Sequence, residues 1–349
     1  MARTGKGWKF VVGVALSVLF LWVAFRKVDV HRMQQAFGEA NYWYLVPGVT
    51  ALFVAHWLRA LRWRYLLEPI KRVRVWPLFS ALMVGYFANT LLPAHLGELV
   101  RAYVIGRRER MSGSAAFATI ALERVIDMLS LLLITALTLT LRPFPPTVAI
   151  PEEVATSGYL MLGATAALFA FLLLLKLKTE VVLRISGACL RPLGKRVAEQ
   201  TQGLLRNFVS GVVPLVRPSD YAVVTVTSVL VWAGYLINLY CVILAFGLTA
   251  YGVGVSAALV VLVITTISIV VPSSPGYVGT YHYLAVLSLG LFGVDKSMAL
   301  SFAVVAHATA VLTVTVVGMA CAWKEGVSLS TMSHREELAP DSLTGTEAG

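Results

Sequence analysis

The chain of 349 residues is 58% hydrophobic and only 13% charged, with a mean hydropathy of +0.78. Soluble domains carry about 25% charged residues, so the composition excludes an ordinary soluble enzyme and predicts an all-α polytopic membrane protein. The net charge of +11 indicates basic loops that face the cytoplasm and anionic lipid, and no nucleic-acid partner is expected.

Apolar segments recur along the chain, several of them about 20 residues long, the length that spans a bilayer. In chain order they lie at roughly 8–25, 42–58, 77–92, 114–141, 157–175, 221–246, 255–271, 281–293 and 299–322. The first segment is followed by Arg26 and Lys27 rather than by a small-residue cleavage site. We therefore interpret it as a retained helix and not as a signal peptide.

Basic residues in short loops mark the cytoplasmic side of a membrane protein. Six of them follow the second segment: Arg59, Arg62, Arg64, Lys71, Arg72 and Arg74. This loop is therefore predicted to be cytoplasmic. The third segment is short and ends at Pro93, and a full crossing there would place Arg101 and the basic residues after it outside. A re-entrant hairpin over about 77–106, which enters from the cytoplasm and turns between Pro93 and Gly97, removes both difficulties.

The remaining segments complete the predicted topology. The chain divides in order into a first membrane repeat, an external loop, a second membrane repeat and a polar C-terminal tail, at 1–141, 142–156, 157–323 and 324–349. The second repeat contains a cytoplasmic amphipathic stretch at 176–217 and a second re-entrant hairpin at about 255–293. On this path 23 of the 29 Lys and Arg residues are cytoplasmic, five are external, and Arg124 alone lies in the membrane. The protein is thus predicted to be a multi-pass cell-membrane protein with both termini in the cytoplasm.

Two interruptions in the apolar pattern resemble each other. "NTLLPAHLGELVRAY" and "ISIVVPSSPGYVGTYHY" both have a proline followed four residues later by glycine. Each is followed by a helix that begins with serine and small residues, at Ser114 and Ser297, and at the equivalent offset from these serines Arg124 corresponds to His307. Three crossings in each half make the second half inverted, which gives about six full transmembrane helices and two re-entrant hairpins in an inverted repeat, an architecture typical of transporters. The residues expected to shape the hairpins are Asn89, Pro93, Gly97, Pro272, Pro275, Gly276 and Gly279.

Charged residues gather around the first interruption. Glu123, Arg124 and Asp127 share one sector of their helix, and each costs at least about 2.5–3.5 kcal/mol at a helix centre unless it faces protein or water. Glu98, at the start of the returning half-helix, lies where a helix dipole favours an anion, and with Arg101 this end would equally favour a substrate phosphate. The predicted substrate-binding residues are Arg101, Arg124, Glu98, Glu123, Asp127, Ser273, Ser274 and His307. A purely structural network that fixes 114–141 to the first hairpin remains an alternative.

The chain resembles a known family, the membrane region of lysylphosphatidylglycerol synthase/flippases and of stand-alone flippase-like membrane proteins. The matching motifs are Asn89-Thr-Leu-Leu-Pro93, Gly97-Glu98-x-x-Arg101, Glu123-Arg124-x-x-Asp127 and Pro272-x-x-Pro275-Gly276-x-x-Gly279. This resemblance implies a protein that moves a lipid or a lipid-linked head group between leaflets. It does not imply aminoacyl transfer, because the soluble catalytic domain of the full synthases has no counterpart in this chain.

Three functions follow from these patterns. The first is a translocator of an anionic phospholipid or a polyprenyl-linked head group. The second is a non-transporting accessory subunit of a lipid-modifying or glycosyl transferase, and the third is a membrane-embedded transferase that uses Glu123 and Asp127. The chain has no nucleophile elbow, P-loop or metal-spaced His/Asp cluster, and Cys189, Cys241 and Cys321 have no zinc-ligand spacing. We therefore expect no enzyme activity, no cofactor and no metal. The expected partners are membrane lipids, with a membrane transferase and a second copy of the chain left open.

Cysteine labelling in intact cells tests the predicted topology. Because both termini are predicted to be cytoplasmic, a Ser333→Cys protein should be protected from a membrane-impermeant thiol reagent, whereas a cysteine placed in 142–156 should react. External labelling at position 333 would show that 255–293 crosses the membrane instead of turning back.

Overall fold

A computed structural model of the chain describes residues 7–26, 28–92, 96–141, 217–270 and 275–327, together with single positions between 156 and 215. Within these residues all regular secondary structure is helical, which confirms the all-α prediction. The first half contains α1 (Gly7–Phe25), α2 (Val30–Glu39), η1 (Tyr42–Tyr44), α3 (Leu45–Leu67), α4 (Val75–Leu91), α5 (Gly97–Glu109) and α6 (Gly113–Leu141). The second half contains α10 (Pro218–Ala245), η3 (Leu248–Tyr251), α11 (Val255–Val270), η4 (Pro275–Tyr277), α12 (Val278–Gly290) and α13 (Lys296–Lys324).

Three of the described helical segments are long and apolar enough to cross a membrane: Tyr42–Leu67, Pro218–Ala245 and Lys296–Lys324. The apolar helices Val75–Leu91 and Val255–Ser268 are shorter. Helix α6 has 29 residues and carries three charged side chains in its interior. The chain is therefore a helical membrane protein, and the number of crossings stays a prediction.

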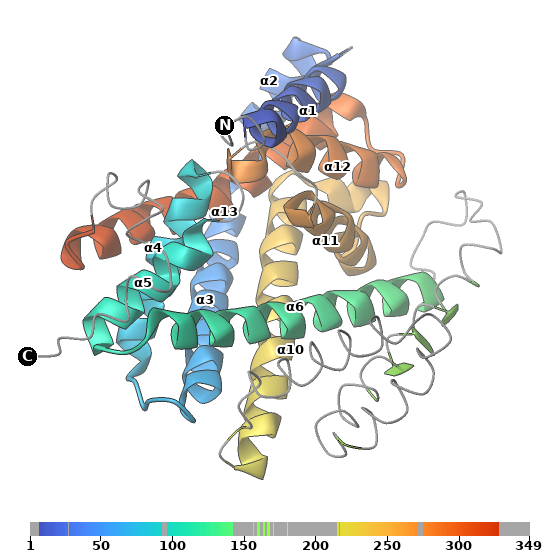
Figure 1. The fold of residues 1–349 in the computed structure, drawn as a ribbon. Coiled ribbons are helices and arrows are strands. Elements are labelled where there is room, and N and C mark those ends of the chain that lie inside the picture. Colours follow the sequence, from blue (N-terminus) through green and yellow to red (C-terminus); the bar gives the residue numbers. More distant parts are fainter. Residues whose placement is uncertain are drawn as a thin grey trace, which may run out of the picture.

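Helices α3 and α10 pack side by side through the middle of the molecule, and α6 crosses both of them (Figure 1). Helix α3 packs on α4, α4 on α5, and α5 on α6; in the second half α10 packs on α11, α11 on α12, and α12 on α13. Across the halves, α4 packs on α13 and α11 packs on α6. In this arrangement α3, α4, α5 and α6 of the first half correspond in order to α10, α11, α12 and α13 of the second half. Each of these contacts has its counterpart between the corresponding helices, as expected for an internal repeat.

Both predicted interruptions are breaks between helices. Helix α4 ends at Leu91 and α5 begins at Gly97, whose backbone N–H donates to Asn89 Oδ1 at 2.8 Å across the break. A side chain at Gly97 would collide with the carbonyl oxygen of Gly85 on α4, so this glycine permits α5 to lie directly against α4.

The second break, between α11 and α12, is formed by η4. Gly276 and Tyr277 have φ values of 71° and 58°, a left-handed conformation that glycine adopts without strain and that other residues adopt less readily. Pro275 and Gly279 flank this turn, whereas Pro93, Pro272, Ser273 and Ser274 lie outside the described residues.

The structure corrects the boundary of the second apolar segment. The predicted segment ends at residue 58 and is followed by a basic loop, but α3 continues to Leu67 and contains Arg59, Arg62 and Arg64. The side chain of Arg62 is fully buried and that of Arg59 nearly so. The loop prediction for these two arginines is wrong because it counted charges without the carboxylates that face them. The predictions for the external loop and the amphipathic stretch fall mostly, and that for the tail beyond 327 wholly, outside the described residues: 142–155 and most of 176–217 are not described.

The contact between α4 and α13 is close enough to test by substitution. A side chain at Gly318 would collide with the carbonyl oxygen of Met83 and with Phe87. We expect Gly318→Leu to lower the stability of the purified protein by about 1–3 kcal/mol or more through overpacking, measured by thermal unfolding in detergent. Gly38→Leu on α2 is the matched control, because a Cβ atom there meets no atom of the described residues within 4 Å. Equal melting temperatures of the two variants would contradict this packing.

Candidate functional site

A group of charged side chains lies at the centre of the first half, where α3, α5 and α6 meet. We call it the charge cluster, and its members are Arg59, Arg62, Glu98, Arg101, Glu123, Arg124 and Asp127. Two of the arginines come from α3, Glu98 and Arg101 from α5, and the other three residues from α6. The structure therefore brings five of the eight predicted substrate-binding residues together.

Glu123 is the centre of the cluster and has no exposed surface. Its Oε2 accepts a hydrogen bond from Arg101 Nη2 at 2.6 Å, and its Oε1 accepts from Arg59 Nη2 at 3.0 Å. Arg62 Nη2 also donates to Oε1, at 3.4 Å. Charge-assisted hydrogen bonds of this kind are the strong ones, so one carboxylate connects α6 to both α3 and α5.

Asp127 lies one helical turn beyond Glu123 and contacts the same two arginines of α3. Its carboxylate accepts hydrogen bonds from Arg59 and, at 2.6 Å, from Arg62 Nη2. Residues three or four apart occupy one face of a helix. The Arg59–Arg62 spacing on α3 therefore matches the Glu123–Asp127 spacing on α6, and the two helices are held together by two carboxylates and two guanidinium groups.

Arg124 and Glu98 form the partly exposed edge of the cluster. Arg124 Nε lies 2.7 Å from Glu98 Oε1, with the two side chains 32% and 22% exposed, and Arg124 Nη1 lies 3.8 Å from Asp127 Oδ2. Glu98 is in the first turn of α5, where the helix dipole stabilises an anion. Glu98 and Arg101 are thus one turn apart on α5, and each is ion-paired with a different residue of α6.

Neutral side chains complete the surroundings of the buried arginines. From α10, Ser228 Oγ accepts from Arg62 Nη1 at 2.9 Å and Tyr235 Oη accepts from Arg59 Nη1 at 3.1 Å. The Arg101 guanidinium carbon lies 3.7 Å from the centroid of the Trp63 ring, a cation–π contact. The second half of the chain therefore contributes hydroxyl groups, and no charge, to the described site.

The charge cluster is not electrically balanced. Among the described residues it holds four guanidinium groups and three carboxylates, which leaves one positive charge in excess when all are ionised. The buried nitrogens Arg101 Nη1, Arg101 Nε and Arg62 Nε have no hydrogen-bond partner among the residues that the structure describes. Buried donors are normally satisfied in native proteins. The unsatisfied donors and the excess charge both indicate a site for an anion.

His307, the remaining described residue predicted to bind substrate, does not join the cluster. Its Nε2 lies 2.8 Å from the carbonyl oxygen of Gly276 in the second break, and its ring stacks on Tyr281 with centroids 4.8 Å apart. Arg124 of α6 contacts the start of α5, and His307 of α13 contacts η4. The two residues occupy equivalent positions in the repeat, and each contacts the helix break of its own half. Because η4 also packs on α4, the second break lies against the first hairpin.

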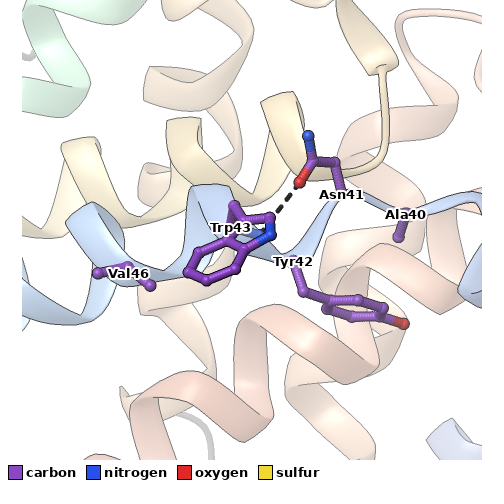
Figure 2. Close-up of a pocket in the computed structure, with 5 residues that line it drawn as sticks. All are labelled: Ala40, Asn41, Tyr42, Trp43 and Val46. Atoms are coloured by element: carbon purple, nitrogen blue, oxygen red, sulfur yellow. Dashed lines mark hydrogen bonds between the residues drawn. The ribbon is translucent and has the colours of Figure 1, made fainter.

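A separate hollow lies at the junction of α2 and α3. Figure 2 shows its lining of Ala40, Asn41, Tyr42, Trp43 and Val46, with the backbone N–H of Trp43 donating to Asn41 Oδ1. The lining contains no charged residue, and Trp43 is largely exposed. Exposed Trp and Tyr side chains at the end of a membrane-spanning helix are typical of the lipid–water interface, so this hollow is distinct from the charge cluster.

Sequence reasoning missed Arg59 and Arg62, together with their neighbours Trp63, Ser228 and Tyr235. Burial does not distinguish Arg124 from these residues, since the side chains of Arg59, Arg62 and Arg101 are more deeply buried than that of Arg124. That Arg124 is the one intramembrane basic residue stays a prediction. The signal that could have found the α3 arginines is their spacing. Two arginines three apart in an otherwise apolar helix match the two carboxylates four apart in 114–141.

The helical fold and this centre define a class: a multi-helical membrane protein with a buried polar site that carries excess positive charge. Residues 10–318 match the family described as lysylphosphatidylglycerol synthase TM region. The match covers most of the chain, and the protein belongs to this family. The resemblance inferred from the sequence motifs is thus confirmed.

Individual relatives extend this picture. The chain is 26% identical over 344 residues to Glycosyltransferase AglD of Haloferax volcanii, which covers 92% of this chain and 55% of AglD. A UPF0104 membrane protein of Methanothermobacter thermautotrophicus is 23% identical, with coverage of 92% of this chain and 97% of that protein. UPF0104 membrane protein MJ1595 of Methanocaldococcus jannaschii is 21% identical, with coverage of 89% and 93%. The chain thus spans about half the length of AglD, and no solved structure matches it.

Removing the central carboxylate tests the cluster. Glu123→Gln would leave three buried guanidinium groups without their shared partner, and breaking a buried ion pair costs about 3–5 kcal/mol. We expect a large loss of thermal stability in detergent. The same change at the exposed Glu39 is the control and should leave the melting temperature unchanged. A Glu123→Gln protein as stable as Glu39→Gln would contradict the assigned role of Glu123.

Proposed function

We propose that the protein is a lipid translocator that moves an anionic phospholipid or a polyprenyl-linked head group between the leaflets of the cell membrane. The single observation that carries this proposal is the excess positive charge of the buried cluster, with its unsatisfied donors on Arg101 and Arg62. A charge inside a membrane protein is expensive and marks a functional site by default. Guanidinium groups bind phosphate through two parallel hydrogen bonds, which makes a lipid phosphate the fitting ligand.

The helix breaks support the same function. We infer that α4–α5 and α11–α12 are re-entrant hairpins in an inverted repeat, that the chain has six full crossings, and that both termini are cytoplasmic. The reciprocal packing of the two halves and the contact of η4 with α4 support this inference. Interrupted helices that meet beside a polar site are typical of transporters, and a helical scaffold has no need of them.

The proposal assigns no bond-making step to this chain. Glu123 and Asp127 would be the carboxylates of an embedded transferase, but each contacts at least two guanidinium groups. A carboxylate engaged in this way is a poor base, because taking up a proton would cost it these charge-assisted hydrogen bonds. The two residues are better suited to holding the arginines in place.

A second function is favoured by one relative. AglD is named a glycosyltransferase and is almost twice as long as the region it shares with this chain. The shared region could therefore serve as a membrane module for a transferase. On this alternative the chain would bind a membrane transferase or its lipid substrate without moving lipid, and the charge cluster would be a docking or structural centre.

Reconstitution in liposomes decides between the two functions. The purified protein is expected to move fluorescent phosphatidylglycerol between leaflets, whereas an accessory subunit would leave the distribution unchanged. Absence of movement in vesicles that contain correctly folded protein would overturn the translocator proposal.

Arg124→Lys tests the phosphate contact within the same assay. Lysine keeps the charge, so the fold should persist, but it lacks the planar fork that binds phosphate through two bonds. We expect thermal stability close to wild type and at least about tenfold slower translocation. The matched control is Arg72→Lys, because Arg72 is exposed and, among the described residues, is paired with Glu68 alone. Full translocation by a stable Arg124→Lys protein would exclude Arg124 as the phosphate ligand and leave Arg101 in that role.

A further inference from the structure

The net charge of the cluster restricts the charge of the ligand, in addition to requiring that the ligand contain a phosphate. The described cluster has one positive charge in excess. A phosphodiester head group carries one negative charge, whereas a diphosphate carries at least two at neutral pH. Only the phosphodiester would make the buried site neutral, and uncompensated charge in a low-dielectric interior is strongly unfavourable.

The other described charged residues on α3, α5 and α10 are exposed or have partners outside the charge cluster. Arg64 and Arg107 are exposed, Glu68 is paired with Arg72, and Asp220 accepts from the backbone N–H of Arg217. At the end of α5, Arg108 is paired with Glu325, and the carbonyl oxygen of Glu109 accepts a hydrogen bond from Lys71, which follows α3. Both pairs lie about two helical turns from Arg101. The sequence from 221 to 294, which includes the rest of α10 and all of α11 and α12, contains no Lys, Arg, Asp or Glu.

We propose that the charge cluster selects its ligand by net charge and accepts a lipid with a single phosphodiester anion in preference to a diphosphate-linked lipid. This rests on the proposed function, because it assumes that the cluster is the head-group site. The unsatisfied buried donors of Arg101 and Arg62, together with the guanidinium of Arg124, supply the phosphate contacts. The partly exposed Arg124–Glu98 pair is the edge through which the head group reaches them.

Within this scheme Glu98 is a specificity-determining residue. It pairs with Arg124 alone among the described residues, and it is the most exposed carboxylate of the cluster. Replacing it by glutamine removes one negative charge while keeping the size of the side chain. The site would then carry two excess positive charges and should suit a diphosphate better than a phosphodiester.

The test is a binding measurement on the full chain in detergent, independent of transport. Phosphatidylglycerol supplies one phosphodiester, geranylgeranyl diphosphate supplies a lipid diphosphate, and native mass spectrometry reports occupancy at pH 8, where histidines are neutral. Wild type is expected to bind phosphatidylglycerol at least about tenfold tighter than the diphosphate. Glu98→Gln should reverse or abolish this preference, and Glu39→Gln should retain it.

A double variant shows whether the ligand preference depends on the net charge of the cluster or on the side chain of Glu98 itself. Glu98→Gln combined with Arg124→Gln removes one charge of each sign, so the net charge returns to the wild-type value. We expect the preference for phosphatidylglycerol to return, even where overall affinity is reduced by the loss of Arg124. A ratio of affinities that stays the same in wild type, Glu98→Gln and the double variant would overturn selection by charge.

Two further outcomes separate this inference from the proposed function. The expected preference in a protein that moves no lipid would support the inference and overturn the translocator. Lipid movement with no charge preference in binding would support the translocator and overturn the inference. Glycerophosphoglycerol, the same phosphodiester without acyl chains, is expected to compete only at far higher concentration. Competition equal to that of phosphatidylglycerol would assign the site to soluble phosphodiesters and overturn the lipid ligand.

Discussion

The fully buried carboxylate of Glu123 is the constraint on which the first half of the protein depends. A charge at such a position is tolerated only when guanidinium groups surround it. Helix α3 must therefore stay helical as far as Arg62, and α5 must begin close enough to α6 for Arg101 to reach Glu123. The interruption between α4 and α5 meets the second requirement, because it places the first turns of α5 beside α6. The ion pair between Arg101 and Glu123 therefore depends on the helix break.

The two halves share an arrangement of helices but not a chemistry. The second half packs its helices in the same order as the first, yet its break is held by the ring nitrogen of His307 on a backbone carbonyl. Its contribution to the charge cluster is limited, in the described residues, to hydroxyl groups of Ser228 and Tyr235. The repeat therefore supplies a common framework, in which the first half carries the charge cluster and the second break lies in a stretch, 221–294, without Lys, Arg, Asp or Glu.

Much of this could be predicted from the sequence, because its signals are local. Apolar segment lengths, the proline and glycine of each interruption, and the shared helix face of Glu123, Arg124 and Asp127 depend only on neighbouring residues. The partners of Glu123 could not be identified in the same way. Arg59 and Arg62 follow an apolar segment and resemble any basic loop until α6 is packed against them. Charge counting assumes that each basic residue faces water, and it fails where carboxylates more than 60 positions away neutralise them.

The position of the charge cluster in the chain has a consequence for how the protein is made. All seven residues of the charge cluster lie between positions 59 and 127, so the guanidinium partners of every carboxylate are synthesised before the second half. The apolar packing of α4 is different, because part of it is made with Gly318 on α13. During insertion the costly charges are thus neutralised early within the first half. The hydrophobic surface of α4 that packs on α13 is covered by protein only after α13, the last described helix, has been synthesised. Lipid can cover this surface until then.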